Sequence, residues 1–294
     1  MELCVAIAEG TKWLGFPCKQ GKVLYVNLEI DPASCINRFL KIYEALDVPM
    51  NNSENIVVWN LRGHAVPLDQ LVPKLIRRVR DLQLSAIIID PIYKVITGDE
   101  NKASEMGQFC NQFDKICTET GCSTIYCHHH SKGAQGSKRA MDRASGSGVF
   151  ARDPDAQLDM IQLELSEDIK NNVRDGHATA WRLESNLREF ENIQPVNFWF
   201  EYPVHRLDTS EELDNIPAVG SVAANLSRSS KRTTVEERRT ALDTAYDVCS
   251  INPPVKIKDI VEYTELNEKT IRRYLAEFND AYWVENGVVG RKTR

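Results

Sequence analysis

The 294-residue chain lacks any apolar run approaching the roughly 18 residues that a membrane-spanning helix needs. Its first nine residues also lack the basic start and long apolar stretch of a signal peptide. None of the eight cysteines belongs to a C-x-x-C pair, and most lie among apolar neighbours, which indicates reduced core thiols and not disulfides. We therefore expect a soluble, cytoplasmic protein that has no membrane partner.

Charge is distributed unevenly along the chain. The net charge is −6, with 42% apolar and 27% charged residues, an ordinary globular composition. Residues 1–220 carry 23 Lys and Arg against 31 Asp and Glu, whereas residues 221–294 carry 13 against 11. An acidic body with a mildly basic tail predicts that a polyanion binds the tail or a local basic loop.

Short β-rich runs alternate with helical patterns in the first half of the chain, after a first helix that begins at Met1. Strands that alternate with helices predict right-handed βαβ units and a parallel sheet. The expected strands are 23–28, 56–61, 84–90 and 123–128, and the expected helices between them are 32–46, 68–82 and 104–120.

The pattern changes after residue 155. Three consecutive β-rich runs, 156–163, 178–187 and 196–202, predict antiparallel strands that extend the same sheet. Polar, Ser-rich residues 208–233 then indicate a linker. We expect one domain over 1–207, the linker, and a small helical domain over 234–294.

Two acidic residues follow expected strands. The apolar run that ends at Asp90 predicts a buried strand, and ligands of parallel sheets bind beyond the carboxyl ends of the strands. Asp90 could therefore hold Mg²⁺, and Glu29, after the strand 23–28, could orient or deprotonate an attacking water. The plainer alternatives are a helix-capping Asp and a solvated loop acid.

The fourth expected strand ends in three histidines, His128 to His130. Neighbouring residues of a strand face opposite ways, so the three converge poorly on zinc, and contact of His128 or His129 with a phosphate is the better interpretation. The Gly-rich loop 131–148 that follows suits phosphates or a nucleic-acid backbone, although a merely solvated loop stays open. Its basic residues are Lys132, Lys138, Arg139 and Arg143, against the single acid Asp142.

Taken in this order, Glu29, Asp90, the strand-end histidine and the segment ASGSGVFARDPDA at 144–156 resemble the RecA-like ATPases of plasmid and phage replicative helicases, of the RepA type. The resemblance covers about residues 1–200. It implies that ATP and Mg²⁺ are bound, with Glu29 activating water and Asp90 serving the metal. It also implies that Arg152 reaches the nucleotide of a neighbouring subunit in a homo-oligomeric ring around DNA. An ion pair of Arg152 with Asp153 or Asp155 is the alternative.

One element of this family is absent from the 294 residues. The phosphate-binding motif G-x-x-x-x-G-K-[ST] should immediately precede the first helix, which here begins at Met1. The residues Gly15, Gly21 and Lys22 do not supply it, since five residues separate the glycines and a strand follows. Either Met1 is internal to a longer, full-length protein, or the motif has been lost from a protein that binds nucleotide weakly or through a partner.

The C-terminal residues predict three helices, at about 234–250, 256–263 and 268–279, and a hairpin with an Asn-Gly turn over 282–289. This order resembles a winged helix-turn-helix, in which the third helix enters the major groove and the wing touches the backbone. A winged helix that binds protein is the alternative. The expected DNA contacts are Lys269, Thr270, Arg272, Arg273, Arg291 and Lys292.

The predicted fold class is therefore α/β: a RecA-like P-loop NTPase sheet, parallel with an antiparallel extension, plus a small C-terminal winged-helix domain. The leading functional hypothesis is a helicase-like ATPase associated with DNA replication, which binds single- or double-stranded DNA. The second is a non-enzymatic DNA-binding regulator or assembly factor on a degenerate ATPase fold. A small-molecule kinase is a weaker third, because it would not account for the C-terminal unit.

Overall fold

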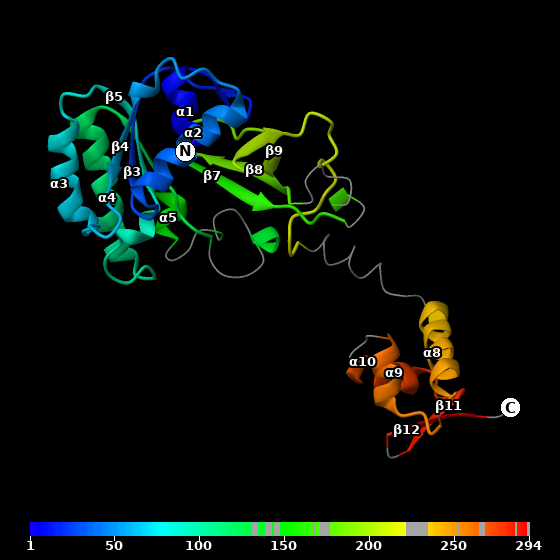
Figure 1. The fold of residues 1–294 in the computed structure, drawn as a ribbon. Helices are drawn as coiled ribbons and strands as arrows, with labels where there is room; N and C mark the ends of the chain where they lie inside the picture. Colours follow the sequence, from blue (N-terminus) through cyan, green and yellow to red (C-terminus); the bar gives the residue numbers. More distant parts are fainter. Residues whose placement is uncertain are drawn as a thin grey trace. The chain divides into compact units, whose positions relative to one another are not determined.

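The chain forms two compact units, residues 1–225 and 226–294, in a computed structural model (Figure 1). We describe each unit by itself. The structure describes residues 1–130, 135–138, 143, 148–166, 169–170, 177–221, 235–251, 253–264, 268–285 and 287–292.

The first unit is built on a parallel sheet with the strand order β4-β3-β5-β6. The central strands are apolar and almost fully buried, as expected for strands that are covered on both faces. All four strands and their parallel direction confirm the prediction from the sequence. Their bounds are β3 (Lys22–Asn27), β4 (Ile56–Asn60), β5 (Leu84–Asp90) and β6 (Ser123–Tyr126).

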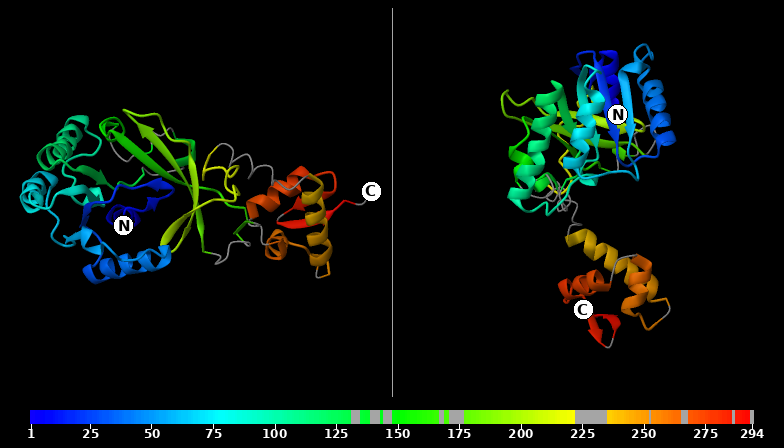
Figure 2. Two further views of the ribbon diagram at one scale, coloured as in Figure 1. Left: turned by 90° about the horizontal axis from the view of Figure 1, so that it is seen from above. Right: turned by 90° about the vertical axis from the view of Figure 1, so that its left-hand side faces the viewer.

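Helices cover both faces of this sheet (Figures 1 and 2). On one face, α3 (Leu68–Val79) and α4 (Ala103–Thr120) pack on the sheet through a core that includes Leu71, Leu75 and Phe113. On the other face, α1 (Glu2–Glu9) and α2 (Pro32–Leu46) pack on Val23 and Tyr25 of β3. The predicted helices are confirmed, except that α3 ends three residues earlier than expected.

Shorter elements join these helices and strands. They are β1 (Lys12–Trp13), β2 (Phe16–Pro17) and the 3-10 turns η1 (Ser53–Asn55), η2 (Ile92–Lys94) and η3 (Gln135–Ser137), with α5 (Val149–Arg152) as a single short helical segment.

The antiparallel strands form a separate sheet and do not extend the parallel one, so this part of the prediction was wrong. Their order is β10-β9-β8-β7, a meander in which each strand pairs with its neighbour along the chain. Each meander strand forms its backbone hydrogen bonds with the next strand along the chain, whereas β6 pairs with β5 in the parallel sheet. The strands are β7 (Ala156–Gln162), β8 (Thr179–Leu187), β9 (Val196–Glu201) and β10 (Val204–Leu207).

Within the first unit, hydrogen bonds attach the meander to the helices α1 and α2. The backbone N–H of His205 on β10 donates to Glu2 of α1 at 3.1 Å, and the guanidinium of Arg206 donates to the Ala45 carbonyl of α2 at 2.9 Å. Residues 208–221, assigned by their polar composition to a linker, pack on the meander instead, where Leu213 is fully buried. The rest of the expected linker, 222–233, lies outside the described residues.

The second unit contains three helices and a two-stranded antiparallel sheet, with its own apolar core. The helices are α8 (Val235–Cys249), α9 (Ile257–Thr264) and α10 (Glu268–Glu277), and the strands are β11 (Tyr282–Glu285) and β12 (Val288–Arg291). Ile260, Ile271 and Leu275 are central to the core, each 3% exposed or less. The order of elements is the one that the sequence predicts.

Candidate functional site

The carboxyl ends of the four parallel strands are joined into one edge by backbone hydrogen bonds. The N–H of Leu61 donates to Asn27 at 2.8 Å, and that of Leu28 donates to Asp90 at 3.0 Å. The N–H of Ile92 in turn donates to Cys127 at 2.9 Å. The segments that carry Glu29, Asp90 and His128 therefore lie side by side, as the parallel topology requires.

A buried asparagine shapes the turn that carries Glu29. The Asn27 side chain is fully buried and donates to the Ile30 carbonyl at 2.6 Å and to the Asn60 amide oxygen at 2.7 Å. Its own oxygen accepts the N–H groups of Ile30 at 2.8 Å and Glu29 at 3.3 Å. Because a buried amide needs these partners, Asn27 holds the turn in one conformation.

Glu29 and His129 belong to one exposed group, with Tyr93 between them. The Tyr93 hydroxyl donates to the Glu29 carboxylate at 3.2 Å. The rings of Tyr93 and His129 lie 5.5 Å apart between centroids, at 42° to each other. The adjacent His128 is half-buried. The Glu29 carboxylate is therefore open to solvent.

The Asp90 side chain lies on the face of the sheet that α1 and α2 cover. Its carboxylate accepts a hydrogen bond from the Tyr25 hydroxyl at 2.7 Å. Burial, together with the negative charge of Asp90, raises the pKa of Tyr25 well above its ordinary value, so Tyr25 stays protonated at neutral pH and donates its hydrogen bond to the carboxylate. Tyr25 therefore fixes the orientation of Asp90.

A hollow of about 280 Å³ lies against Asp90, where the amino end of α1 meets the edge of the sheet. Arg38 of α2 lines it and forms no ion pair with a carboxylate in the part of the chain that the structure describes. The turn between β9 and β10 closes one side. Its lining includes Met1, Glu2, Tyr25, Ile30, Arg38 and Asp90.

The residues that line this hollow are partly suited to binding a phosphate together with a metal ion. A helix amino end and a guanidinium attract a phosphate, and one carboxylate oxygen is a usual protein ligand of Mg²⁺, whose other ligands are phosphate oxygens and water. No group of three or more metal-ligating side chains occurs among the described residues, so Asp90 would hold Mg²⁺ as a single carboxylate. Glu29 does not line this hollow, so the two acids share an edge but belong to adjoining groups.

Sequence reasoning missed Arg38 and Tyr25. A signal for Arg38 exists, since it lies one helical turn from both Cys35 and Ile42, which are buried. The Arg38 side chain is itself exposed, so it lies at the margin of the buried stripe, where it lines the hollow. The sequence contains no such signal for Tyr25, because aromatic residues are common in buried strands, where they pack in the apolar core.

Arg152 lies at the end of α5 with its side chain exposed. Its guanidinium donates to the Gly148 carbonyl of the same helix at 3.3 Å. The ion pair expected as the alternative is formed by Arg188 instead, which contacts the Asp155 carboxylate at 3.2 Å. Arg188 also donates to the carbonyls of Arg152 and Asp153, at 2.5 Å and 2.7 Å, and so ties this turn to β8.

Arg143 does not have the exposed position expected of a DNA contact. It is 7% exposed and pairs with Glu184 at 2.6 Å and Asp159 at 3.4 Å, which are opposite each other on β8 and β7. Its charge is thus neutralised inside the first unit, and we exclude it from the proposed DNA-binding set. Lys138 of the same loop is half-buried, and Lys132 and Arg139 lie outside the described residues.

In the second unit, α10 presents its basic residues to solvent. Ile271 and Leu275 face the core, whereas Lys269, Arg272 and Arg273 are exposed and Thr270 is half-buried. Arg272 pairs with Glu268 one turn earlier at 2.7 Å, and the Arg273 guanidinium lies 5.4 Å from the centroid of the Tyr274 ring. Such exposed pairs contribute little and exchange readily for a phosphate.

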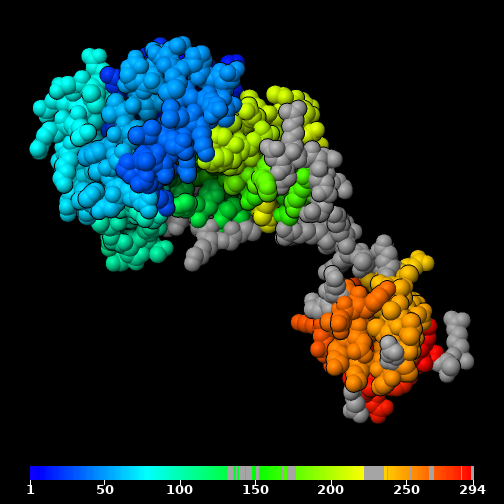
Figure 3. All heavy atoms as spheres, viewed as in Figure 1, coloured from blue at the N-terminus to red at the C-terminus, as the bar shows by residue number. Residues whose placement is uncertain are grey.

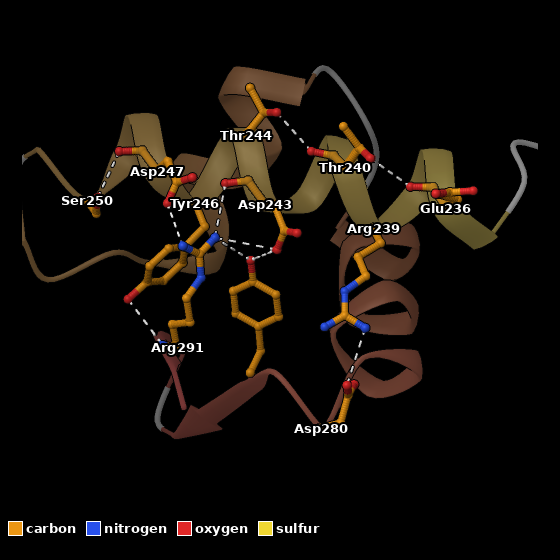
Figure 4. A network of polar contacts seen from close by, with 11 residues as sticks. Glu236, Arg239, Thr240, Asp243, Thr244, Tyr246, Asp247, Ser250, Asp280 and Arg291 are labelled. Carbon is orange, nitrogen blue, oxygen red and sulfur yellow. Dashed lines mark hydrogen bonds and ion pairs between the residues drawn. The ribbon is translucent and has the colours of Figure 1, made fainter. Parts of the chain in front are cut away.

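Arg291 lies at the centre of an internal network, which Figure 4 shows. Its guanidinium contacts Asp247 at 2.8 Å and Asp243 at 3.4 Å, and lies over the rings of Tyr246 and Tyr282 at 5.1 Å and 5.6 Å. The Tyr282 hydroxyl also donates to Asp243.

The prediction that Arg291 contacts DNA overlooked these partners, of which Asp243, Tyr246 and Asp247 lie more than 40 residues away in the sequence. Lys292 is likewise engaged, since its ammonium donates to the Asn279 carbonyl at 2.8 Å. We therefore assign Arg291 a structural role, and we keep the exposed cations of α10 as the candidate DNA contacts.

Comparison with known families places this arrangement in context. Residues 1–135, which contain the whole parallel sheet, match a family model described as an AAA domain. The match supports an AAA or RecA-like ATPase family and an ATPase type of function, which in general uses a nucleotide and a metal. None of the helices in the described part of the chain has both the length and the apolar character to cross a bilayer.

Proposed function

We propose that this protein is a RecA-like ATPase associated with DNA replication, of the plasmid and phage replicative helicase type. The observation that carries the proposal is the common edge where Glu29, Asp90 and His129 follow adjacent parallel strands, beside the amino end of α1. The match of residues 1–135 to an AAA domain supports the same reading.

Each residue has a proposed part in ATP hydrolysis. Asp90, oriented by Tyr25, would hold Mg²⁺, which neutralises developing charge on the phosphates. Arg38 and the amino end of α1 would contact phosphate oxygens. Glu29 would orient the attacking water and accept its proton. His129 lies near Glu29, because Tyr93 contacts both residues. Arg152, exposed at the end of α5, would act on a neighbouring subunit's nucleotide in a ring.

The role of Glu29 has a direct test. In an ATP-hydrolysing form of the protein, Glu29→Gln should reduce turnover about 100-fold or more, because it removes a general base, and should spare ATP binding. Glu44→Gln removes a charge of the same sign from the exposed face of α2 and should leave both unchanged. Normal turnover by Glu29→Gln would remove Glu29 from the mechanism.

DNA binding is assigned to the second unit, as a winged helix-turn-helix whose α10 enters the major groove. Arg272→Ala with Arg273→Ala should weaken DNA binding about tenfold and lower its salt dependence, because phosphate contacts are lost. Lys256→Ala with Lys258→Ala changes the net charge equally beside α9 and should have a smaller effect. Equal losses in the two variants would contradict a specific role for α10.

A second candidate is a non-enzymatic DNA-binding regulator or assembly factor on a degenerate ATPase fold. It is favoured by one observation: residues 1–294 contain no G-x-x-x-x-G-K-[ST] motif. An in-frame copy of that motif upstream of the Met1 codon would favour the ATPase, and an in-frame stop close to Met1 would favour the regulator.

A further inference from the structure

The outward face of α3 carries positive charges that have no acidic partners. Lys74, Arg77 and Arg78 lie on this face, and Arg80 follows directly after the helix; all four are exposed. None of the four forms an ion pair with a carboxylate in the described part of the chain. We call Lys74, Arg77, Arg78 and Arg80 the α3 basic face.

Carboxylates that could pair with these cations are not scarce in the first unit. Residues 1–220 contain 31 acidic residues against 23 basic ones, so partners of opposite charge are abundant. The loop residue Arg143 and the meander residues Arg188 and Arg206 each pair with a carboxylate. The acids nearest in sequence to the α3 basic face are Asp69, in the first turn of α3, and Asp81, after Arg80.

The helix dipole accounts for only part of the α3 basic face. Arg77 and Arg78 lie in the last turn of α3, where cations stabilise the carboxyl end of a helix. Lys74 lies in the middle of the helix, beyond the reach of that effect. The acidic side chains Asp114 and Glu119 of the neighbouring α4 are exposed but make no ion pair with this face.

The geometry of the face fits a phosphate backbone. Lys74 and Arg78 are one helical turn apart, about 6 Å along the axis, and Arg77 lies between them. Phosphates on one strand of a duplex are spaced by about 3.4 Å along the axis. The separation of Lys74 and Arg78 is close to two such steps, so these two cations can contact different phosphates of one strand.

Arg78 is held ready for such a contact. Its guanidinium lies 5.2 Å from the centroid of the Trp59 ring on β4. A cation over an aromatic face keeps its N–H donors free at the edge of the plane, which are the groups that bind phosphate oxygens. Less conformational freedom is then lost on binding.

We propose that the α3 basic face binds the phosphate backbone of DNA, as a second contact besides α10. This inference rests on the proposed DNA-binding function and adds a site on the first unit. In Figure 3 the residues of α3 lie in the cyan surface at the margin of that unit, where a strand of DNA can reach them.

The test compares charge-matched variants of the full chain. Lys74→Gln with Arg77→Gln should raise the dissociation constant for a labelled oligothymidylate about tenfold. It should lower the salt slope by about 0.7 per lost phosphate contact on single strands and about 0.9 on duplex. Lys12→Gln with Lys19→Gln removes two exposed charges elsewhere in the unit that form no ion pair among the described residues, and it should change neither quantity appreciably. Arg77→Lys keeps the charge and should retain binding.

The outcomes separate this inference from the proposed function. If the wild-type chain does not bind DNA, both fail. If the α10 variant loses binding but the α3 variant matches the control, only the inference fails. If the α3 variant binds DNA normally and instead changes the sedimentation coefficient, the face binds a second copy of the chain, which also overturns the inference. Thermal unfolding of each variant checks that the fold is retained.

Discussion

Asp159 joins three segments of the first unit at a single carboxylate. It contacts His130 at 3.4 Å, Gln157 at 3.1 Å and the buried Arg143 at 3.4 Å. We expect Asp159→Asn to lower the free energy of unfolding by about 2 kcal/mol, because charge-assisted hydrogen bonds are lost beside a buried guanidinium. Urea unfolding measures this change. Asp155→Asn, which removes an exposed carboxylate, should cost about 0.5 kcal/mol or less.

The same residue predicts a pH dependence with a definite sign. Burial opposes ionisation of Asp159, but the hydrogen bonds from His130 and Gln157 and the charge of Arg143 outweigh it and hold its pKa below the ordinary value. A depressed carboxyl pKa stabilises the fold above about pH 4 and loses that contribution as the pH falls through the lowered pKa. The difference between wild type and Asp159→Asn should therefore be full at pH 7 and shrink in acid. A difference that grows in acid would contradict this assignment.

Individual residues differ in how far the sequence alone could predict their position. Asp90 and Glu29 were predictable as neighbours, because parallel strands bring their carboxyl ends to one edge whatever the connections between them. Arg143 was not, because its partner Glu184 lies 41 residues away on a strand whose pairing the sequence does not encode locally. A basic residue in a glycine-rich loop looks the same in sequence whether it faces DNA or a buried acid.

At the scale of elements, Arg291 attaches β12 to α8 by two ion pairs and a contact with the Tyr246 ring, and it also lies over the Tyr282 ring of β11 (Figure 4). Burial and the hydrogen bond to Asp243 raise the pKa of Tyr282 to about 12, so this tyrosine stays protonated and remains a donor within the network. Arg291→Gln should lower the free energy of unfolding of the second unit by about 1 kcal/mol, the sum of several weak exposed contacts.

The control for this prediction is Lys258→Gln, since Lys258 is exposed on α9 and makes no ion pair among the described residues. It should leave unfolding unchanged. Measured on the full chain by thermal unfolding, the Arg291→Gln effect should be confined to the transition of residues 226–294. An equal effect of both substitutions would mean that the network contributes nothing measurable.

Helices and parallel strands were predictable because their patterns are local. The apolar spacing of Leu71, Val72 and Leu75 specifies α3, and Asp31 followed by Pro32 specifies the start of α2, where the Asp31 carboxylate accepts the N–H groups of Ala33 and Ser34. The meander strands were also predictable, but their membership of a separate sheet was not. The alternation of apolar and polar residues predicts which face of a strand is buried, but it does not predict the sheet in which that strand pairs.

The whole molecule consists of two units with separate cores, and the proposed function divides between them. The first unit holds the strand edge and the hollow beside Asp90, and the second holds α10. Composition anticipated the division through the polar stretch near residue 220. It could not show that residues 208–221 pack on the meander, because the few apolar anchors there, such as Leu213, are outnumbered by polar neighbours.

In the proposed function, Asp90 serves a metal–nucleotide complex at the edge of the parallel sheet. The most direct measurement is equilibrium binding of a fluorescent ATP analogue to the full chain, with and without Mg²⁺, for the wild type, Asp90→Asn and the exposed-acid control Asp114→Asn. We expect Mg²⁺ to strengthen binding about tenfold in the wild type and the control, and Asp90→Asn to abolish this gain. A gain from Mg²⁺ that survives unchanged in Asp90→Asn would contradict it.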